Sequence, residues 1–366
     1  MELKNFFMIV VLGFLVFTLT GCAEIQTDEV IKLGWVGPLT GKTAQWGEPA
    51  YKTAKMAVDD VNSNGGVNGK LFELVVEDSQ SEPKNAATAA QKFINQDKVD
   101  IILTHLSSES LVVAPLAEEA QIVMFASATS TPDLTEAGDY IFRVTPVNKE
   151  GQTIAEELEK NGIQKVALLT EQSKYTLPIK NAFEESYSGE IVLNEEFTST
   201  DLDSRTLVTK VKESDIEAVV LFPETLVKIS ELLRSIQEQE VTADIYGNAA
   251  FNTPEIFDLV DPEMNNFAFA TLYIDETYDL TAKFIEDYKT NYGEEMPNKA
   301  HTLDAATKIY ILAEGMAICG DDTECLKDFL YGIKDKQTVS GILSIDENGD
   351  ADKTYIIKRI VGEEIV

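Results

Sequence analysis

Short apolar runs rich in β-branched residues alternate with helix-like stretches along this chain. The first three runs are IKLGWVG from Ile31, LFELVVED from Leu71 and VDIILT from Val99. Helical spacing of apolar residues over 48–62 and a proline that opens the stretch 83–95 predict a helix after each of the first two runs. Such alternation is typical of parallel strands joined by crossover helices, so the sequence predicts an α/β fold.

The same alternation recurs in the second half of the chain. VALLT from Val166, IVLNEEF from Ile191 and EAVVLF from Glu217 are separated by predicted helices near 178–187 and 204–212. We therefore expect two similar α/β units in tandem. No long Pro/Gly/Ser linker divides them, which favours lobes joined by several short hinge strands.

The last quarter of the chain is expected to be mostly helical before it ends in strands. The predicted helices lie near 279–291, 298–318 and 323–333, and the predicted strands are GILSID and TYIIKRIV. No G-x-G-x-x-G or G-x-x-x-x-G-K-[ST] motif opens a helix, so no nucleotide or other cofactor is expected. No G-x-S-x-G motif is present either, and enzymatic catalysis has no sequence support.

The N-terminal segment has the pattern of an export signal. Lys4 precedes an apolar run over 6–17, which is too short for a permanent membrane helix, and the segment LTGC ends at Cys22. This predicts a signal peptide over 1–21 and a lipidated Cys22 that begins a linker over 22–28. The alternative is an ordinary signal peptide in which Cys22 has no lipid.

The chain is strongly acidic, and it contains three cysteines. A formal net charge of −33 argues against nucleic-acid partners and against adsorption to anionic lipid, which leaves the lipid as the only expected membrane attachment. Cys319 and Cys325 lie within CGDDTEC, where a local disulfide is expected. A metal site is not expected, because the only histidines, His105 and His301, are isolated in sequence, and His105 is expected to be structural.

Several segments between residues 30 and 350 resemble one known family. They are GPLTGKTAQWGEPAYKTAKMAVDDVNSNGGVNGK with the following ELVVED, then THLSSES, ASATSTPDLT and RVTP. In this order and spacing they resemble the type I periplasmic binding proteins, in the branch that binds branched-chain amino acids and amides. The resemblance implies two Rossmann-like lobes with a ligand cleft between them, at the carboxyl ends of the strands.

The resemblance also implies where the chain passes between the lobes. We expect three crossings, near 145–149, 271–275 and 339–345. The first lobe would then comprise 29–147 and 273–341, and the second lobe 148–272 and 342–366.

The resemblance further implies a set of ligand-binding residues. The hydroxyls of Ser108 and Ser130 would bind a ligand carboxylate together with backbone groups of Ala128 and Thr129, at a point where a helix begins. Without the resemblance, Ser108 would be read as an ordinary N-cap serine. Two aromatic residues would enclose the ligand from opposite lobes, although packing is the ordinary role of isolated aromatics; they are Trp46 and Tyr175.

One position departs from the family pattern. Amino-acid binders have an acid within the segment that matches YGNAAF, where it binds the ligand ammonium, but this chain has Ala249 there. Either another acid replaces it or the ligand has no amine. Glu224 and Glu109 are the candidates, although a solvated surface acid is the favoured interpretation of Glu109. Asn248, in the same segment, completes the expected ligand-binding set.

The resemblance implies a lipid-anchored solute-binding protein of an ABC importer, acting as a monomer on the outer face of the cytoplasmic membrane or in the periplasm. It would capture a small polar molecule, with a branched-chain or related amino acid as the first expectation, by closing two lobes. Its expected partners are the permease subunits. An amine-free carboxylate or an amide is the alternative ligand, and a ligand-sensing receptor is the alternative function.

Overall fold

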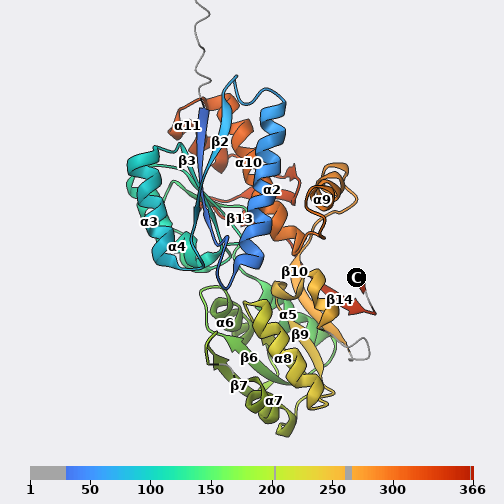
Figure 1. Cartoon of the computed structure of the whole chain (residues 1–366). Helices are drawn as coiled ribbons and strands as arrows, with labels where there is room; N and C mark the ends of the chain where they lie inside the picture. Colours follow the sequence, from blue (N-terminus) through green and yellow to red (C-terminus); the bar gives the residue numbers. More distant parts are fainter. Residues whose placement is uncertain (1–29, 202, 260–265, 363) are drawn as a thin grey trace, which may run out of the picture.

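The computed structural model describes residues 30–201, 203–259, 266–362 and 364–366. They form a mixed α/β structure of two lobes, each with a largely parallel sheet covered by helices on both faces (Figure 1). Within these residues, none of the helices combines the length and the apolar character needed to cross a bilayer.

The first lobe contains a five-stranded sheet in which every pair of neighbours is parallel. Its strand order is β2-β1-β3-β4-β5, with β1 Val30–Gly37, β2 Leu71–Asp78, β3 Ile101–His105, β4 Met124–Ser127 and β5 Ile141–Arg143. All residues of β3 and β4 are buried, as expected for strands covered on both faces. The sequence analysis predicted β1, β2 and β3 but did not identify β4 and β5.

Helices cover both faces of this sheet with two separate apolar cores. One core holds α2 (Ala44–Ser63) and α10 (Lys299–Cys319) together with α9 (Asp279–Tyr292) and α11 (Thr323–Tyr331). The other core holds α3 (Pro83–Lys92) and α4 (Ser107–Glu119). A single π-helical turn, Phe93–Asp97, continues α3.

Helix α2 begins one turn earlier than predicted. The apolar spacing over 48–62 predicted a start near residue 48, but the helix begins at Ala44 and includes Pro49. Gly47 permits this start, because a Cβ there would lie 2.0 Å from the Pro38 carbonyl oxygen. Trp46 therefore projects from the first turn of a helix that is held tightly against the end of β1.

The second lobe contains a seven-stranded sheet of order β15-β14-β10-β9-β8-β6-β7. Neighbouring strands from β10 to β7 in this order are parallel, whereas β14 pairs antiparallel with β10 and β15 pairs antiparallel with β14. The strands are β6 Lys165–Glu171, β7 Glu190–Phe197, β8 Ala218–Phe222, β9 Asp244–Gly247, β10 Phe267–Leu272, β14 Tyr355–Val361 and β15 Glu364–Ile365. One face packs on α5 (Glu150–Lys160) and α6 (Thr176–Ser186), and the other on α7 (Ser204–Glu213) and α8 (Leu226–Glu238). Two 3₁₀ turns, Ala249–Phe251 and Pro254–Asp258, follow β9.

The chain passes between the lobes three times, and the three passages lie side by side. The first follows β5, where Pro146 forms a bridge with Ala351. The second follows β10, where the Tyr273 N–H donates to the Thr354 carbonyl oxygen at 2.9 Å. The third passage therefore runs through Lys353 and Thr354 into β14.

The predicted third crossing near 339–345, and with it the boundary between 341 and 342, is wrong. A small antiparallel sheet of order β11-β12-β13 keeps this segment in the first lobe; its strands are β11 Lys336–Thr338, β12 Gly341–Ile345 and β13 Ala351–Asp352. Leu343, Ile345 and Ala351 belong to the first lobe's core. A short apolar strand has the same sequence pattern whether it crosses to another lobe or pairs in a hairpin. The sequence alone therefore could not distinguish a crossing strand from a hairpin strand.

A buried carboxylate of α10 is bonded to the first and the third of these passages between the lobes. The Asp304 carboxylate pairs with the Lys353 ammonium and accepts a hydrogen bond from the Thr145 hydroxyl at 2.8 Å. Lys353 also donates to the Ser340 hydroxyl at 2.9 Å. Asp304 is fully buried, and this network fixes the hinge to the first lobe.

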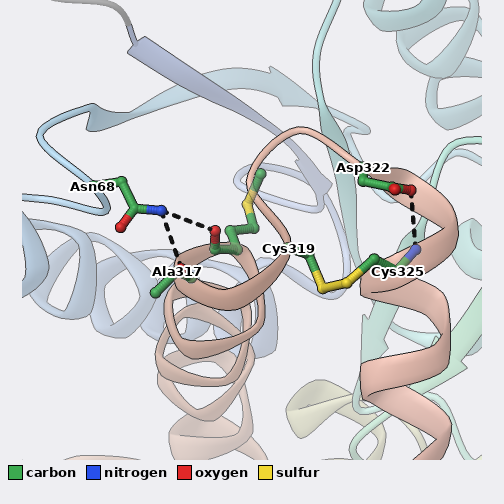
Figure 2. The surroundings of a disulfide bond; sticks show 6 residues. Asn68, Ala317, Cys319, Asp322 and Cys325 are labelled. Atoms are coloured by element: carbon green, nitrogen blue, oxygen red, sulfur yellow. Dashed lines mark hydrogen bonds between the residues drawn. A yellow bond between two sulfur atoms is a disulfide. The ribbon is translucent and has the colours of Figure 1, made fainter.

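The predicted disulfide is confirmed. Figure 2 shows Cys319, at the end of α10, bonded to Cys325 in the first turn of α11. The Asp322 carboxylate caps α11 by accepting from the Cys325 N–H at 3.1 Å, and Asn68 donates to the Ala317 carbonyl oxygen at 3.1 Å. The bond therefore ties together two helices that share the first lobe's core.

Candidate ligand-binding site

A pocket with a cavity volume of about 50 Å³ lies between the two lobes, and residues of both lobes line it. The first lobe lines it with Trp46, His105, Leu106, Ser107, Ala128, Asn298, His301 and Thr302, and the second lobe with Tyr175, Glu224 and Ala250.

Most of these residues lie just beyond the carboxyl ends of parallel strands. Leu106 and Ser107 follow β3, Ala128 follows β4, and Glu224 follows β8 by two residues. Open α/β sheets bind ligands at this edge because the strand ends and helix starts present backbone groups there. The carboxyl ends of the parallel strands in both sheets therefore face the same pocket.

The start of α4 presents unpaired donors to the pocket. Leu106 has φ of 73° and makes no side-chain cap, so Ser107 begins the helix uncapped. The Ser107 hydroxyl is buried and has no hydrogen-bond partner among the described residues. A helix start with free N–H groups and an unpaired hydroxyl favours an anion such as a carboxylate.

Ala128 lines the pocket in the left-handed region of backbone space, with φ of 48°. Its N–H donates to the Thr145 hydroxyl at 2.8 Å, so this N–H serves the hinge rather than a ligand. Leu106 and Ala128 are two non-glycine residues with positive φ at one pocket, and such strain persists where surrounding structure enforces it.

Ser108 and Glu109 lie beside the pocket rather than on its wall. The Ser108 hydroxyl donates to the Glu109 carboxylate at 2.6 Å, and the Ser79 hydroxyl donates to the same carboxylate at 3.0 Å. The interpretation of Glu109 as a solvated surface acid is wrong, because its side chain is fully buried. Burial raises the pKa of Glu109, while these hydrogen bonds oppose the shift.

Ser130 and Asn248 also lie outside the pocket wall. Ser130 is buried, and its hydroxyl accepts from the Asn148 amide at 3.4 Å. Asn248 is buried and donates to the Pro223 carbonyl oxygen at 2.9 Å, which ties together the loops that follow β8 and β9. Both residues support the segments that carry Ala128 and Glu224.

Trp46 and Tyr175 lie at the pocket from opposite lobes. The Trp46 indole N–H donates to the Glu224 carbonyl oxygen at 3.0 Å, a hydrogen bond between the lobes. An exposed ion pair between Lys174 and Asp133, at 3.1 Å, is a second contact across the cleft. The lobes are therefore in contact around the pocket.

Glu224 places a carboxyl group on the pocket wall. Its backbone N–H donates to the Glu171 carboxylate at 2.7 Å, which fixes the loop after β8. Burial, followed by the like charge of Glu171, raises the pKa of Glu224 to about 7. Among the described residues, none forms an ion pair with Glu224, so a ligand cation would restore its charged form.

Glu150 is a functional candidate that the sequence analysis missed. It is fully buried in the first turn of α5, where its carboxylate accepts from the Ala249 N–H at 2.7 Å and from the Tyr175 hydroxyl at 3.0 Å. Burial raises the pKa of Glu150 to about 7. Glu150, in α5, thus places a carboxylate beside Ala249, the position at which the family pattern has an acid. No local sequence signal marks this pairing.

His105 and His301 both line the pocket, although the sequence analysis left them aside. His105 is almost fully buried and shares a hydrogen bond between its Nδ1 and the Ser127 hydroxyl at 3.1 Å. His301 is bonded through Nδ1 to the Asn298 side-chain oxygen at 2.9 Å. Burial lowers the pKa of His301 to about 4 and that of His105 well below its usual value, so both imidazoles are neutral.

No group of three or more His, Cys, Asp or Glu side chains within the described ranges is arranged to hold a metal ion. The chemistry of the pocket is therefore carried by backbone donors, hydroxyls, neutral imidazoles and carboxyl groups. Such a set can bind and orient a small molecule with both a carboxylate and an amine.

Known proteins are similar to this chain in both sequence and architecture. The chain is 29% identical to an amino acid binding protein of Pseudomonas aeruginosa over 260 residues, 69% of each chain. It is 26% identical over 328 residues to a Leu/Ile/Val-binding protein of Rhizobium johnstonii, which covers 87% of this chain and 88% of the relative. A branched-chain amino acid transporter substrate-binding protein of Streptococcus pneumoniae, solved with isoleucine, superposes with a TM-score of 0.84 at 26% identity, covering 92% of this chain and 98% of that one.

The family described as periplasmic binding protein matches residues 30–363, nearly the whole described chain. This match agrees with the two sheets, the three passages between lobes and the pocket at their facing edges. The chain belongs to the periplasmic binding protein family.

Proposed function

We propose that this protein is the substrate-binding component of an ABC importer and that it captures an α-amino acid between its lobes. The observation that carries the proposal is the composition of one pocket. Its first-lobe wall offers the unpaired Ser107 hydroxyl at a helix start, and its second-lobe wall offers the Glu224 carboxyl, which feels the charge of Lys42 but forms no ion pair among the described residues. The relatives named above support an amino acid as the ligand class.

Each end of the amino acid has a complementary partner. The ligand carboxylate binds at the start of α4, where helix N–H groups and Ser107 donate. The ammonium binds Glu224, which takes the role that Ala249 cannot fill. Glu150 holds the Tyr175 hydroxyl, and Tyr175 and Trp46 enclose the ligand from opposite lobes.

Hinge closure is the proposed binding mechanism. A ligand held by Ser107 on one lobe and Glu224 on the other stabilises the form in which both lobes touch it. The few contacts across the cleft, such as Trp46 with Glu224, leave this form dependent on the ligand. A lipid on Cys22, outside the described residues, and membrane permease subunits as partners complete the proposal.

A thermal-shift screen of the full-length protein tests the ligand class. The panel contains α-amino acids, amides, and aliphatic and aromatic carboxylates without an amine. A ligand at a hundred times its Kd stabilises the folded state by about 2.7 kcal/mol. We expect the largest shifts from α-amino acids. Shifts from amine-free compounds alone would contradict the role of Glu224.

A further inference from the structure

Lys308 contacts the end of β3, which carries part of the pocket wall. It is fully buried in α10, and its ammonium donates to the Thr104 carbonyl oxygen at 2.8 Å. His105, the residue after Thr104, lines the pocket. The ammonium also lies 4.9 Å from the centroid of the Trp35 ring, and this ring stacks on the His105 imidazole at a centroid distance of 6.2 Å. Lys308 therefore lies behind the first-lobe wall of the pocket.

The start of α4 is close to this ammonium. Ser107 follows Thr104 by three residues, which span at most about 11 Å. The Thr104 and Ser110 hydroxyls are hydrogen-bonded at 2.7 Å, so the end of β3 is held against the first turn of α4. Charges separated by on the order of 10 Å still interact when protein rather than water lies between them. A carboxylate bound at Ser107 is therefore within range of the Lys308 charge.

The charged groups around Lys308 leave one positive charge in excess. Asp304 lies one turn earlier in α10, and its carboxylate forms an ion pair with the Lys353 ammonium. All three charged side chains are buried, so two ammonium groups share one carboxylate. The neutral imidazoles of His105 and His301 add no charge. Among the described residues, none forms an ion pair with Lys308.

Glu109, the buried acid near the start of α4, is directed away from Lys308. Its carboxylate accepts hydrogen bonds from the Ser108 and Ser79 hydroxyls. Ser79 follows β2, the edge strand of the first sheet, whereas Lys308 contacts β3, two strands further in. Glu109 is therefore not the counterion of Lys308.

The interior position makes the unpaired ammonium costly. Burial lowers the pKa of Lys308 to about 7, and the charge of Asp304 opposes this shift only in part. A buried ammonium without its own counterion favours a ligand that brings a negative charge close to it.

We infer that Lys308 is a positioning residue, whose buried ammonium acts through the end of β3 to attract the ligand carboxylate to the start of α4. The ligand class is then narrowed to molecules with a free α-carboxylate. Amides of α-amino acids have the same ammonium but no negative charge, and they bind weakly. The inference rests on the proposed amino-acid function and deepens it, because it assigns a charge to the lobe whose pocket wall carries none.

Calorimetric titrations of the full-length protein with two matched pairs test the inference. The pairs are leucine with leucinamide, and alanine with alaninamide. At pH 6 Lys308 and the amines of all four compounds are protonated, so the members of a pair differ in charge only at the carboxyl end. We expect the wild type to bind each amino acid more tightly than its amide. In Lys308→Met, we expect the affinity for the amino acid to fall about tenfold and that for the amide to change by less than about twofold.

Lys180→Met is the matched control. It removes one positive charge from a half-buried side chain of the second lobe, where Lys180 pairs with Glu184 and Glu196, and neither affinity should change beyond about twofold. Denaturant unfolding of Lys308→Met should show no loss of stability, because methionine replaces an unpaired buried charge. Equal binding of amino acid and amide by the wild type would overturn the inference, as would a preference that persists in Lys308→Met.

A second measurement leaves Lys308 unchanged. Glu224→Gln cannot release a proton from position 224 on binding, so proton uptake by Lys308 is not masked in this variant. Titrations of it with leucine and alanine at pH 7.5, in phosphate and in Tris, measure the protons exchanged with the buffer. We expect net proton uptake, because the ligand carboxylate stabilises the charged form of Lys308. No uptake, or net release, would contradict the role of Lys308.

The same titrations distinguish this inference from the proposed function. Binding of amino acids with an unchanged preference in Lys308→Met leaves the amino-acid function intact and rejects only the role of Lys308. A wild-type protein that binds none of the α-amino acids in the thermal-shift screen rejects both.

Discussion

Asp304 at the hinge is fully buried and Glu224 at the pocket is partly buried, and the charges around these two acids differ. Asp304 pairs with the Lys353 ammonium and accepts from the Thr145 hydroxyl. Glu224 has a like charge, Glu171, as its strongest charged neighbour. A buried charge that is paired within the chain holds structure together, whereas one without a partner is available to a ligand. The comparison predicts that the hinge pair affects mainly stability and that Glu224 affects mainly binding.

The largest effect is expected from breaking the hinge pair. Asp304→Ala leaves the Lys353 ammonium buried without a countercharge, which costs about 3–5 kcal/mol of unfolding free energy. Denaturant unfolding monitored by circular dichroism measures it. As a control, Asp59→Ala removes an exposed pair with Lys55 and changes stability by about 0.5 kcal/mol or less. Equal losses of unfolding free energy in the two variants would contradict the structural role of the ion pair between Asp304 and Lys353.

The pH dependence of stability tests the unpaired acids. The pKa of both Glu150 and Glu224 rises to about 7 in the folded protein, from 4.5. The folded state then holds these protons more tightly than the unfolded state, so their contribution is complete below pH 4.5. It is lost as the pH rises through about 7, by on the order of 3 kcal/mol per group.

Denaturant unfolding at pH 5 and pH 7.5 without ligand checks this sign. Glu150→Gln and Glu224→Gln each remove one titrating group, so each variant should show a smaller loss between the two pH values than the wild type. An identical loss in all three proteins would show that neither carboxyl group has a raised pKa.

Removing the charge of Glu224 is expected to affect binding rather than stability. Glu224→Gln keeps the shape of the side chain but cannot pair with a ligand ammonium, and we expect the affinity for the best amino acid to fall tenfold or more, about 1.4 kcal/mol. Calorimetry measures this loss, and unfolding at pH 7.5 should show no decrease in stability. Glu213→Gln, at the exposed end of α7, serves as the matched control.

The smallest expected effects distinguish two neighbouring serines. Ser107→Ala removes a hydroxyl without a partner, so stability should be unchanged while ligand affinity falls about threefold to tenfold. Ser108→Ala removes a hydrogen bond to Glu109 and should reduce stability by about 1 kcal/mol with a smaller effect on affinity. The reverse pattern would assign the ligand carboxylate to Ser108.

The sequence predicted best the features that depend on the residue pattern of one short segment. The α/β class, the strands that became β1, β2, β6 and β8, and the disulfide between Cys319 and Cys325 all follow from short segments. The short buried strands β4 and β5 lack such a signal, because segments of only four and three residues fit a helix or a loop equally well. The passage at Lys353 was missed for a related reason, since β12 pairs within a hairpin.

Prediction of the site depended on which groups the fold brings together. Trp46, Ala128, Tyr175 and Glu224 lie on the pocket wall. The family resemblance had selected the first three, and Glu224 was a candidate to replace the acid missing at Ala249. Ser107 was missed by one residue, because helix phase decides which of two adjacent serines faces the pocket. Glu150 approaches Ala249 from a position 99 residues away in sequence, a pairing that only the tertiary structure reveals.

The central claim is that an unpaired acid on one lobe and a helix start on the other bind the two charged groups of an amino acid. The most direct measurement is a pair of calorimetric titrations of the full-length protein. One uses the amino acid that gives the largest thermal shift, and the other uses the same molecule without its amine. We predict that the amino acid binds roughly a hundredfold more tightly, about 2.7 kcal/mol. Equal or tighter binding of the amine-free molecule would contradict the account.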